Sequence, residues 1–175
     1  VEYAPHDREL GFAYPDGAVV DDASPPAARD PMGHIYHPTT RPGSRLPHAW
    51  LTQGDRKLST HDLIPMGGFA LITGAKGRDW HNAAAQIAAE SGITMHAWSV
   101  GPGGDVADPS GQWLSEREIG DDGAILVRPD AHVAFRALSR VDDPVGTLRN
   151  ALAQILSGSR PASKTAELMA ASSGV

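Results

Sequence analysis

The chain has 175 residues, with 15 Lys or Arg against 21 Asp or Glu and a formal net charge of −6. This length allows one domain, or two small ones, with a packed core, and the acidic balance argues against nucleic-acid binding, which needs a basic surface. The sequence has no cysteine and no apolar run of about 18 residues, so disulfides, cysteine redox chemistry and a membrane span are not expected.

The chain starts at Val1 without a methionine, and no basic segment followed by an apolar one opens it. We therefore expect neither a secreted protein nor a complete translation product, but a fragment of a longer cytoplasmic protein.

Prolines are concentrated in the first 57 residues and include the Pro25-Pro26 pair. Each proline disfavours helix at the preceding residue and removes a backbone donor, so residues 1–57 are predicted to form an extended, Pro-rich arm. Within this arm, residues 10–20 combine apolar alternation with a Pro15-Asp16-Gly17 turn, a pattern that predicts a hairpin.

A strand–helix–strand unit is predicted after residue 68. Residues 69–73 form a short apolar run closed by Gly74, which suits a strand buried on both faces. Asp79 is placed to cap a helix that ends at Ser91, with Gly92 at the left-handed C-terminal position. The β-branched and aromatic residues 93–100 predict a second strand, parallel to the first because a helical crossover joins them.

The remaining pattern predicts a hairpin and a last helix. Residues 124–128 and 132–136 flank a Pro129-Asp130-Ala131 turn. Asp143 can cap a helix that begins at Pro144 and runs to residue 157, and residues 158–175 are expected to form a flexible tail. The fold class is thus α/β: residues 58–157 would form a thioredoxin-like β-α-β-β-β-α domain with a four-stranded mixed sheet, after the arm at residues 1–57.

The start of the first long helix is where a redox-active protein of this fold carries its dithiol, because helix amides stabilise a thiolate there. Residues 77–80 occupy this place without sulfur, so that chemistry is not available. Glycine amides with Lys76 and Arg78 could still hold an anion, although an ordinary helix start is the favoured interpretation.

Other candidate sites are weaker. His34, His37, His48 and His61 leave a metal site open as an alternative, but no helix or strand fixes the first pair, and solvated loop histidines are favoured. The acidic pairs at 121–122 and 142–143 suit turns and caps, and residues 101–105 lack a dinucleotide fingerprint. We assign no catalytic, cofactor-binding or metal-binding residue.

Residues 38–51 have a different character. They place Arg41, Arg45, His48 and Trp50 on a proline-stiffened backbone, which loses little entropy on docking and suits an interface anchor. A loop that merely wraps its own domain remains an equal alternative.

This segment, together with residues 121–136, resembles the C-terminal portion of FAD-dependent aromatic-ring hydroxylases of the phenol and chlorophenol monooxygenase type. Residues 10–20 resemble the start of that portion, so the likeness covers most of residues 9–156. The resemblance implies a parent enzyme that uses NAD(P)H, FAD and O2 to insert one oxygen atom into a phenolic ring. It departs from the family at Ala131, where glycine is common; a positive φ there would cost about 1 kcal/mol.

The resemblance also implies that this chain is a non-catalytic third domain packed on the FAD-binding and substrate domains of the same parent chain. Its role would be domain packing, active-site shielding or subunit contact in a possible homo-oligomer, without nucleic acid or membrane. No position here matches the family's FAD fingerprint, so FAD and NAD(P)H would bind elsewhere. The alternative is a free-standing, redox-inactive thioredoxin-like protein-binding module. The candidate interface residues are Arg41, Arg45, His48, Trp50, Arg128 and Asp130.

Overall fold

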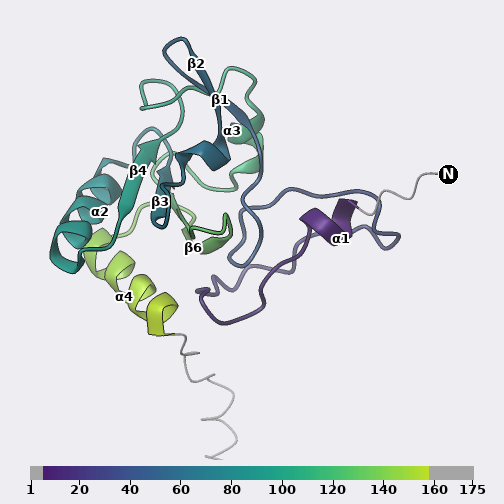
Figure 1. Ribbon diagram of the computed structural model, residues 1–175, viewed down its shortest axis with the longest axis horizontal. Helices are drawn as coiled ribbons and strands as arrows, with labels where there is room; N and C mark the ends of the chain where they lie inside the picture. The colour runs from purple at the N-terminus through teal and green to yellow at the C-terminus, as the bar shows by residue number, and fades with distance from the viewer. Residues whose placement is uncertain (1–5, 158–175) are drawn as a thin grey trace, which may run out of the picture.

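A four-stranded mixed sheet organises the part of the chain that the computed structural model describes, residues 6–157 (Figure 1). The expected tail at residues 158–175 lies outside the described residues. The elements in chain order are α1 (His6–Leu10), β1 (Trp50–Gln53), β2 (Arg56–Ser59), the 3-10 helix η1 (Thr60–Leu63), β3 (Phe69–Thr73), α2 (Arg78–Ser91), β4 (Met95–Ser99), α3 (Gln112–Glu116), β5 (Ala124–Val127), β6 (Val133–Ala137) and α4 (Pro144–Ser157).

The sheet has the order β4-β3-β5-β6. Strands β3 and β4 are parallel, as a helical crossover through α2 requires, and β5 is antiparallel to both β3 and β6. The α/β fold predicted from the sequence, with its four-stranded mixed sheet, is confirmed; the β-α-β-β-β-α order holds with one addition, the short helix α3 between β4 and β5.

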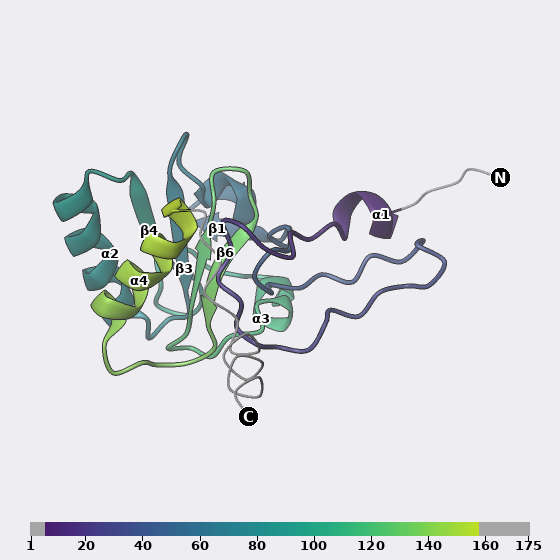
Figure 2. The same ribbon diagram turned by 90° about the horizontal axis from the view of Figure 1, so that it is seen from below.

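Both faces of the sheet are buried, but different kinds of structure cover them (Figure 2). Leu71 and Leu126 point to the face covered by α2 and α4, which contribute Trp80 and Leu148 to that core. Ile72 lies on the opposite face, because successive side chains of a strand alternate in direction. That second core is completed by the β1–β2 hairpin, η1, α3 and the segment before β1, through Leu46, Leu51, Leu58, Leu63 and Trp113.

Two of the three predicted helix caps are present. Gly92 ends α2 with φ +71°, and the Asp143 side chain accepts a hydrogen bond from the Gly146 amide at 2.8 Å at the start of α4. The predicted cap at Asp79 is wrong: Gly77 occupies the N-cap position of α2 and makes no side-chain cap. Asp79 lies inside the first turn, where its negative charge still favours the helix dipole.

The hairpin predicted over residues 10–20 is not formed. Ala13 pairs instead with Ser44, and the Val20 amide donates to the Ala134 carbonyl at 2.7 Å, so the two halves of the segment bond to different parts of the molecule. A hairpin that the sequence did not reveal joins β1 and β2 around Gly54, which has φ +58°. This β1–β2 hairpin crosses the expected boundary between residues 57 and 58.

Residues 6–42 are here called the projecting arm. Its outer part extends beyond α3 and away from the helices that cover the sheet (Figure 2), while Ala18 and Val20 lie against the core of the sheet. The arm returns to the domain at Gly43, whose carbonyl accepts from the Tyr14 amide at 3.0 Å and whose amide donates to Val133 at 2.7 Å. Gly43 has φ +90°, and a Cβ there would lie 2.1 Å from the Tyr14 carbonyl oxygen. Only glycine therefore fits at this crossing of backbones. No helix within residues 6–157 is long and apolar enough to cross a bilayer.

Candidate functional site

The loop between β3 and α2 occupies the place where a redox-active thioredoxin fold carries its dithiol. Its amides already have acceptors: Lys76 donates to the Asp121 carbonyl at 2.8 Å, and Gly77 donates to Gly74 at 3.1 Å. The hollow beside it is lined by the carboxylates of Asp79 and Asp122 as well as by basic groups. An anion would therefore find few free amide donors in this loop and would be repelled by the two carboxylates. The pyrophosphate of FAD is such an anion, so FAD does not fit this loop.

His81, on the first turns of α2, faces the interior of the same region. Its Nε2 lies 3.1 Å from the Thr73 hydroxyl oxygen, and Thr73 is fully buried. Burial lowers the pKa of His81 below its usual value, and the nearby Asp105 carboxylate opposes this only in part. The Thr73 hydroxyl is closed to substrate, so this pair stabilises the strand–helix junction rather than forming a nucleophile with its base.

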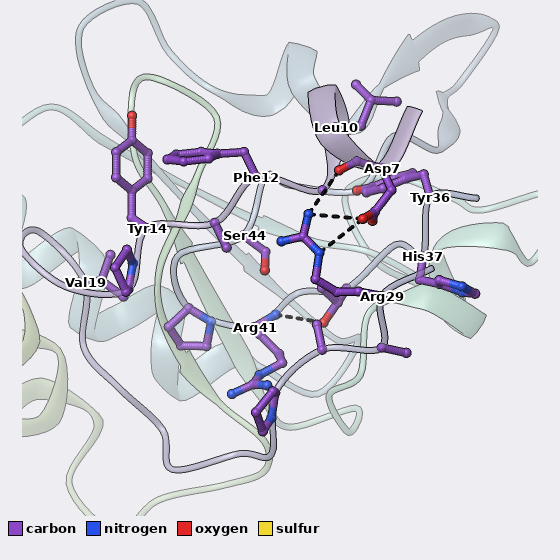
Figure 3. A pocket seen from close by; sticks show the side chains of 18 of the residues that line it. Asp7, Leu10, Phe12, Tyr14, Val19, Arg29, Tyr36, His37, Arg41 and Ser44 are labelled. Carbon is purple, nitrogen blue, oxygen red and sulfur yellow. Dashed lines mark hydrogen bonds and ion pairs between the residues drawn. The ribbon is translucent and has the colours of Figure 1, made fainter. Parts of the chain in front are cut away.

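A cavity of about 380 Å³ opens in the projecting arm (Figure 3). On one side, the rings of Phe12 and Tyr14 meet edge to face with centroids 5.1 Å apart. On the other, the Asp7 carboxylate pairs with the Arg29 guanidinium at 3.1 Å and ties two distant parts of the arm together. The cavity is thus lined by aromatic and aliphatic side chains around a few fixed charges.

Arg41 lines this cavity as well as the adjoining hollow near Ser24. One of its terminal nitrogens donates to the Ser24 carbonyl, while its Nε is buried and has no hydrogen-bond partner within residues 6–157. Arg41 therefore keeps part of its donor capacity unused at the arm.

Two further candidate interface residues gather around Tyr14. The guanidinium of Arg128 lies 4.8 Å from the centroid of the Tyr14 ring and also pairs with the Asp130 carboxylate. The ring of His132 contacts the Tyr14 ring edge to face, with the two ring centroids 4.9 Å apart. Burial raises the pKa of Asp130, but the hydrogen bond and charge of Arg128 outweigh it and hold that pKa below its usual value. We call Tyr14, Arg128, Asp130 and His132 the Tyr14 cluster.

His48 and Trp50 form a second group at the start of β1. Their rings meet at right angles with centroids 4.9 Å apart, and the Lys57 ammonium lies 4.1 Å from the Trp50 ring. Trp50 remains 47% exposed. An exposed tryptophan with a fixed cation on its ring is a suitable interface anchor. We call these three residues the Trp50 cluster.

Arg45 lies between the two groups along the chain. Its backbone bridges to His132, and its half-buried side chain makes no hydrogen bond or ion pair with the residues that the structure describes. The structure thus brings Arg128 and Asp130 together, and His48 and Trp50 together, while Arg41 lies apart in the arm.

The sequence analysis did not single out Arg136, which ties the arm to the sheet. Its side chain is 3% exposed and contacts the Asp22 carboxylate at 2.7 Å and the Glu118 carboxylate at 2.8 Å. Glu118 also accepts from the Thr39 hydroxyl at 2.7 Å and has φ +49°. An arginine inside the otherwise apolar run at residues 133–137 was the available signal, because a buried guanidinium requires carboxylate partners.

Of the four histidines considered as metal ligands, His48 and His61 lie with their ring centroids 6.0 Å apart. Within residues 6–157, no three His, Asp or Glu side chains come together in a way that could hold a metal ion. His61 instead places its Nε2 2.8 Å from the Leu46 carbonyl oxygen, and burial lowers its pKa despite that bond.

Comparison with known proteins identifies relatives along nearly the whole chain. A family model of the C-terminal region of aromatic-ring hydroxylases matches residues 39–159. The chain is 42% identical over 163 residues to phenol 2-monooxygenase of Pseudomonas sp. (strain EST1001), covering 92% of this chain and 27% of that protein. It is 39% identical to 2,4-dichlorophenol 6-monooxygenase of Cupriavidus pinatubonensis (strain JMP 134 / LMG 1197), covering 88% and 26%.

Solved structures agree with these matches. The flavin-dependent monooxygenase PieE, crystallised with FAD and substrate, superposes with a TM-score of 0.80 at 40% identity over 89% of this chain and 27% of PieE. Aklavinone-11 hydroxylase, in complex with FAD and aklavinone, superposes with a TM-score of 0.72 at 36% identity over 85% of this chain and 26% of its own. The chain therefore spans about a quarter of the length of these relatives.

Proposed function

Because this chain belongs to the family of aromatic-ring hydroxylase C-terminal domains, we propose that it is the non-catalytic C-terminal domain of an FAD-dependent monooxygenase acting on a phenolic ring. The observation that carries this proposal is the 42% identity to a phenol 2-monooxygenase across 92% of this chain but only 27% of that protein. The parent polypeptide would use NAD(P)H, FAD and O2, with FAD supplying the oxygen-transfer chemistry.

The donor set of this chain supports a non-catalytic role. In the β3–α2 loop, which was considered as an anion site, the Lys76 and Gly77 amides are bonded internally. The hydroxyl beside His81 belongs to the fully buried Thr73. FAD, NAD(P)H and the phenolic substrate would therefore bind to the part of the parent chain that precedes this domain.

The domain would contribute to the parent enzyme through contacts made by its surface residues. The Tyr14 cluster and the Trp50 cluster, with Arg41 and Arg45, offer fixed cations and partly exposed rings for contact with the FAD-binding and substrate domains or with a second subunit. Such contact has a chemical use, because the oxygen-transfer step must be shielded from water until the substrate is in place. Consumption of NAD(P)H suits a cytoplasmic enzyme.

Absorbance spectroscopy of two purified proteins tests this proposal. The 175-residue chain is expected to be colourless and to bind no added FAD. The full-length gene product is expected to carry FAD stoichiometrically and to oxidise NAD(P)H faster when a phenol is added. A flavin spectrum or phenol hydroxylation by the 175-residue chain would refute the non-catalytic role. A gene product without an upstream flavin-binding region would instead favour a free-standing binding module.

A further inference from the structure

The projecting arm carries an unusual share of the exposed apolar surface. Among residues 6–157, five of the ten exposed large hydrophobic side chains lie on the arm, although it contains only 37 of those 152 residues. These five are Leu10, Phe12, Tyr14, Met32 and Ile35. Apolar surface concentrated in one segment marks an interaction site rather than the ordinary scatter of a soluble protein.

We propose that the projecting arm docks onto the upstream part of the same polypeptide, with the face formed by Leu10, Phe12 and Tyr14 seated on an apolar patch of that part. This inference rests on the proposed function, since it assumes the longer parent chain. Beyond the proposed function, the inference names the surface through which the domain contacts the rest of the polypeptide and the chemical character of the partner surface.

The arm has almost no core of its own. Within residues 6–42, Val19 is the one buried large apolar side chain. Polar contacts hold its shape instead, with the Asp7–Arg29 pair within the arm and Arg136 binding Asp22 at its root. The arm is therefore fixed in an extended form that leaves Leu10, Phe12, Met32 and Ile35 exposed, as a preorganised docking segment requires. Tyr14 is also 36% exposed, although it contacts Phe12, Arg128 and His132.

The charges of the arm indicate what surrounds the apolar patch on the partner. Residues 6–42 contain six acidic and three basic side chains, and Glu9, Asp16 and Asp21 are exposed. A partner with an apolar centre and a rim of Lys or Arg would match this face. A second copy of this chain would present the same acidic rim, and its like charges would repel.

The upstream polypeptide also has the advantage of position. The matching family model describes a C-terminal region, and the relatives are about four times as long as this chain, so their other domains precede the equivalent of the arm. Helix α1 lies in the outer part of the arm, away from the sheet (Figures 1 and 2). An upstream domain would thus be tethered beside the docking face, which raises its effective concentration to roughly millimolar values.

Photo-crosslinking in the full-length gene product identifies the occupant. A benzophenone amino acid replaces Phe12, the protein is irradiated at low concentration, and crosslinked peptides are identified by mass spectrometry. The expected result is an intramolecular crosslink to a peptide upstream of residue 1. Crosslinks between two copies, crosslinks confined to residues 6–157, or no crosslink would each overturn the proposal.

Hydrogen exchange in the same full-length protein gives an independent measure. Phe12→Ser is expected to accelerate exchange of the hydrogen-bonded Tyr14 and Val20 amides at least tenfold. Met66→Ser, a matched change at a fully exposed side chain outside the arm, is expected to leave these rates within twofold. Equal rates in the two variants would contradict docking through Phe12. The flavin absorbance of each sample reports on the proposed function separately, so failure of the docking proposal and failure of the hydroxylase assignment can be told apart.

Discussion

Replacing Arg136 with methionine is expected to lower the free energy of unfolding of the 175-residue chain by about 3 kcal/mol. The guanidinium is 3% exposed and lies 2.7 Å from the Asp22 carboxylate and 2.8 Å from that of Glu118. Methionine preserves much of the apolar stem but leaves two carboxylates without their shared cation. Removing one partner of a buried ion pair costs about 3–5 kcal/mol. The lower end applies because the Glu118 side chain is 42% exposed and can regain water.

Urea unfolding and thermal denaturation measure this effect. For a chain of this length, a loss of 3 kcal/mol corresponds to a melting temperature lower by about 6–12 °C. Arg140→Met is the matched control, since Arg140 lies 3.9 Å from Asp79 and both side chains are mostly exposed. That change is expected to alter stability by less than about 0.5 kcal/mol. Equal losses in the two variants would refute the role of Arg136 as the tie between arm and sheet.

The effect of Arg136→Met is also expected to depend on pH. Burial raises the pKa of the Asp22 carboxyl, but hydrogen bonds from Ser24 and Arg136 outweigh burial and hold this pKa below its usual value. In the same way, burial raises the pKa of the Glu118 carboxyl, but hydrogen bonds from Thr39 and Thr40 outweigh burial and hold it below its usual value. A lowered carboxyl pKa contributes stability above the unfolded value of about 4, and this contribution is lost as the pH falls through the folded value. The stability gap between wild type and variant should therefore narrow below about pH 4. A gap that is unchanged at pH 3 would refute the electrostatic explanation.

Three further changes test local features. Ala131→Gly is expected to stabilise the chain by about 0.5–1 kcal/mol in urea unfolding, because Ala131 has φ +62°, whereas Ala85→Gly on the exposed side of α2 should destabilise it by about 1 kcal/mol. Gly74→Ala places a Cβ 2.5 Å from main-chain atoms and should cost about 2 kcal/mol. Gly103→Ala should cost less, about 1 kcal/mol, because its Cβ meets nothing within 4 Å and only its φ of +76° is unfavourable. In an NMR titration, burial should place the pKa of His81 below 6.5, so that stability falls as the pH drops below that value; a midpoint at or above 6.5 would contradict the packing described.

The sheet could be predicted because its signals are local. Residues 69–73 and 124–127 are short apolar runs between turn residues, and both are buried along their whole length. Gly92 and Asp143 act at helix ends through contacts within a few residues of the chain. The positive φ that the family comparison suggested at position 131 is also present, since Ala131 has φ +62°.

The arm was harder to predict because its backbone bonds are made with distant partners. The Pro15-Asp16-Gly17 signal favours a turn, but the flanking residues pair with Ser44 and with Ala134 rather than with each other. A local pattern cannot reveal such partners, which depend on the folded sheet.

The grouping of the candidate interface residues was likewise beyond the sequence. Arg128 and Asp130 could be placed together on one turn, but the sequence gives no sign that Tyr14 would lie beneath Arg128. Tyr14 and Arg128 are separated by more than a hundred residues along the chain. Arg136 was the exception that composition could have revealed, as a charged residue in a buried strand.

The coverage of the second sheet face by residues 46–63 has a practical consequence for exchanging this domain between related hydroxylases. A junction at residue 58 would cut within β2 and would remove Leu46 and Leu51 from the donor core to which Ile72 also belongs. A chimera cut near residue 43 would transplant the fully buried residues of both hydrophobic layers, and the arm of the new host would then have to supply a carboxylate for Arg136 in the place of Asp22.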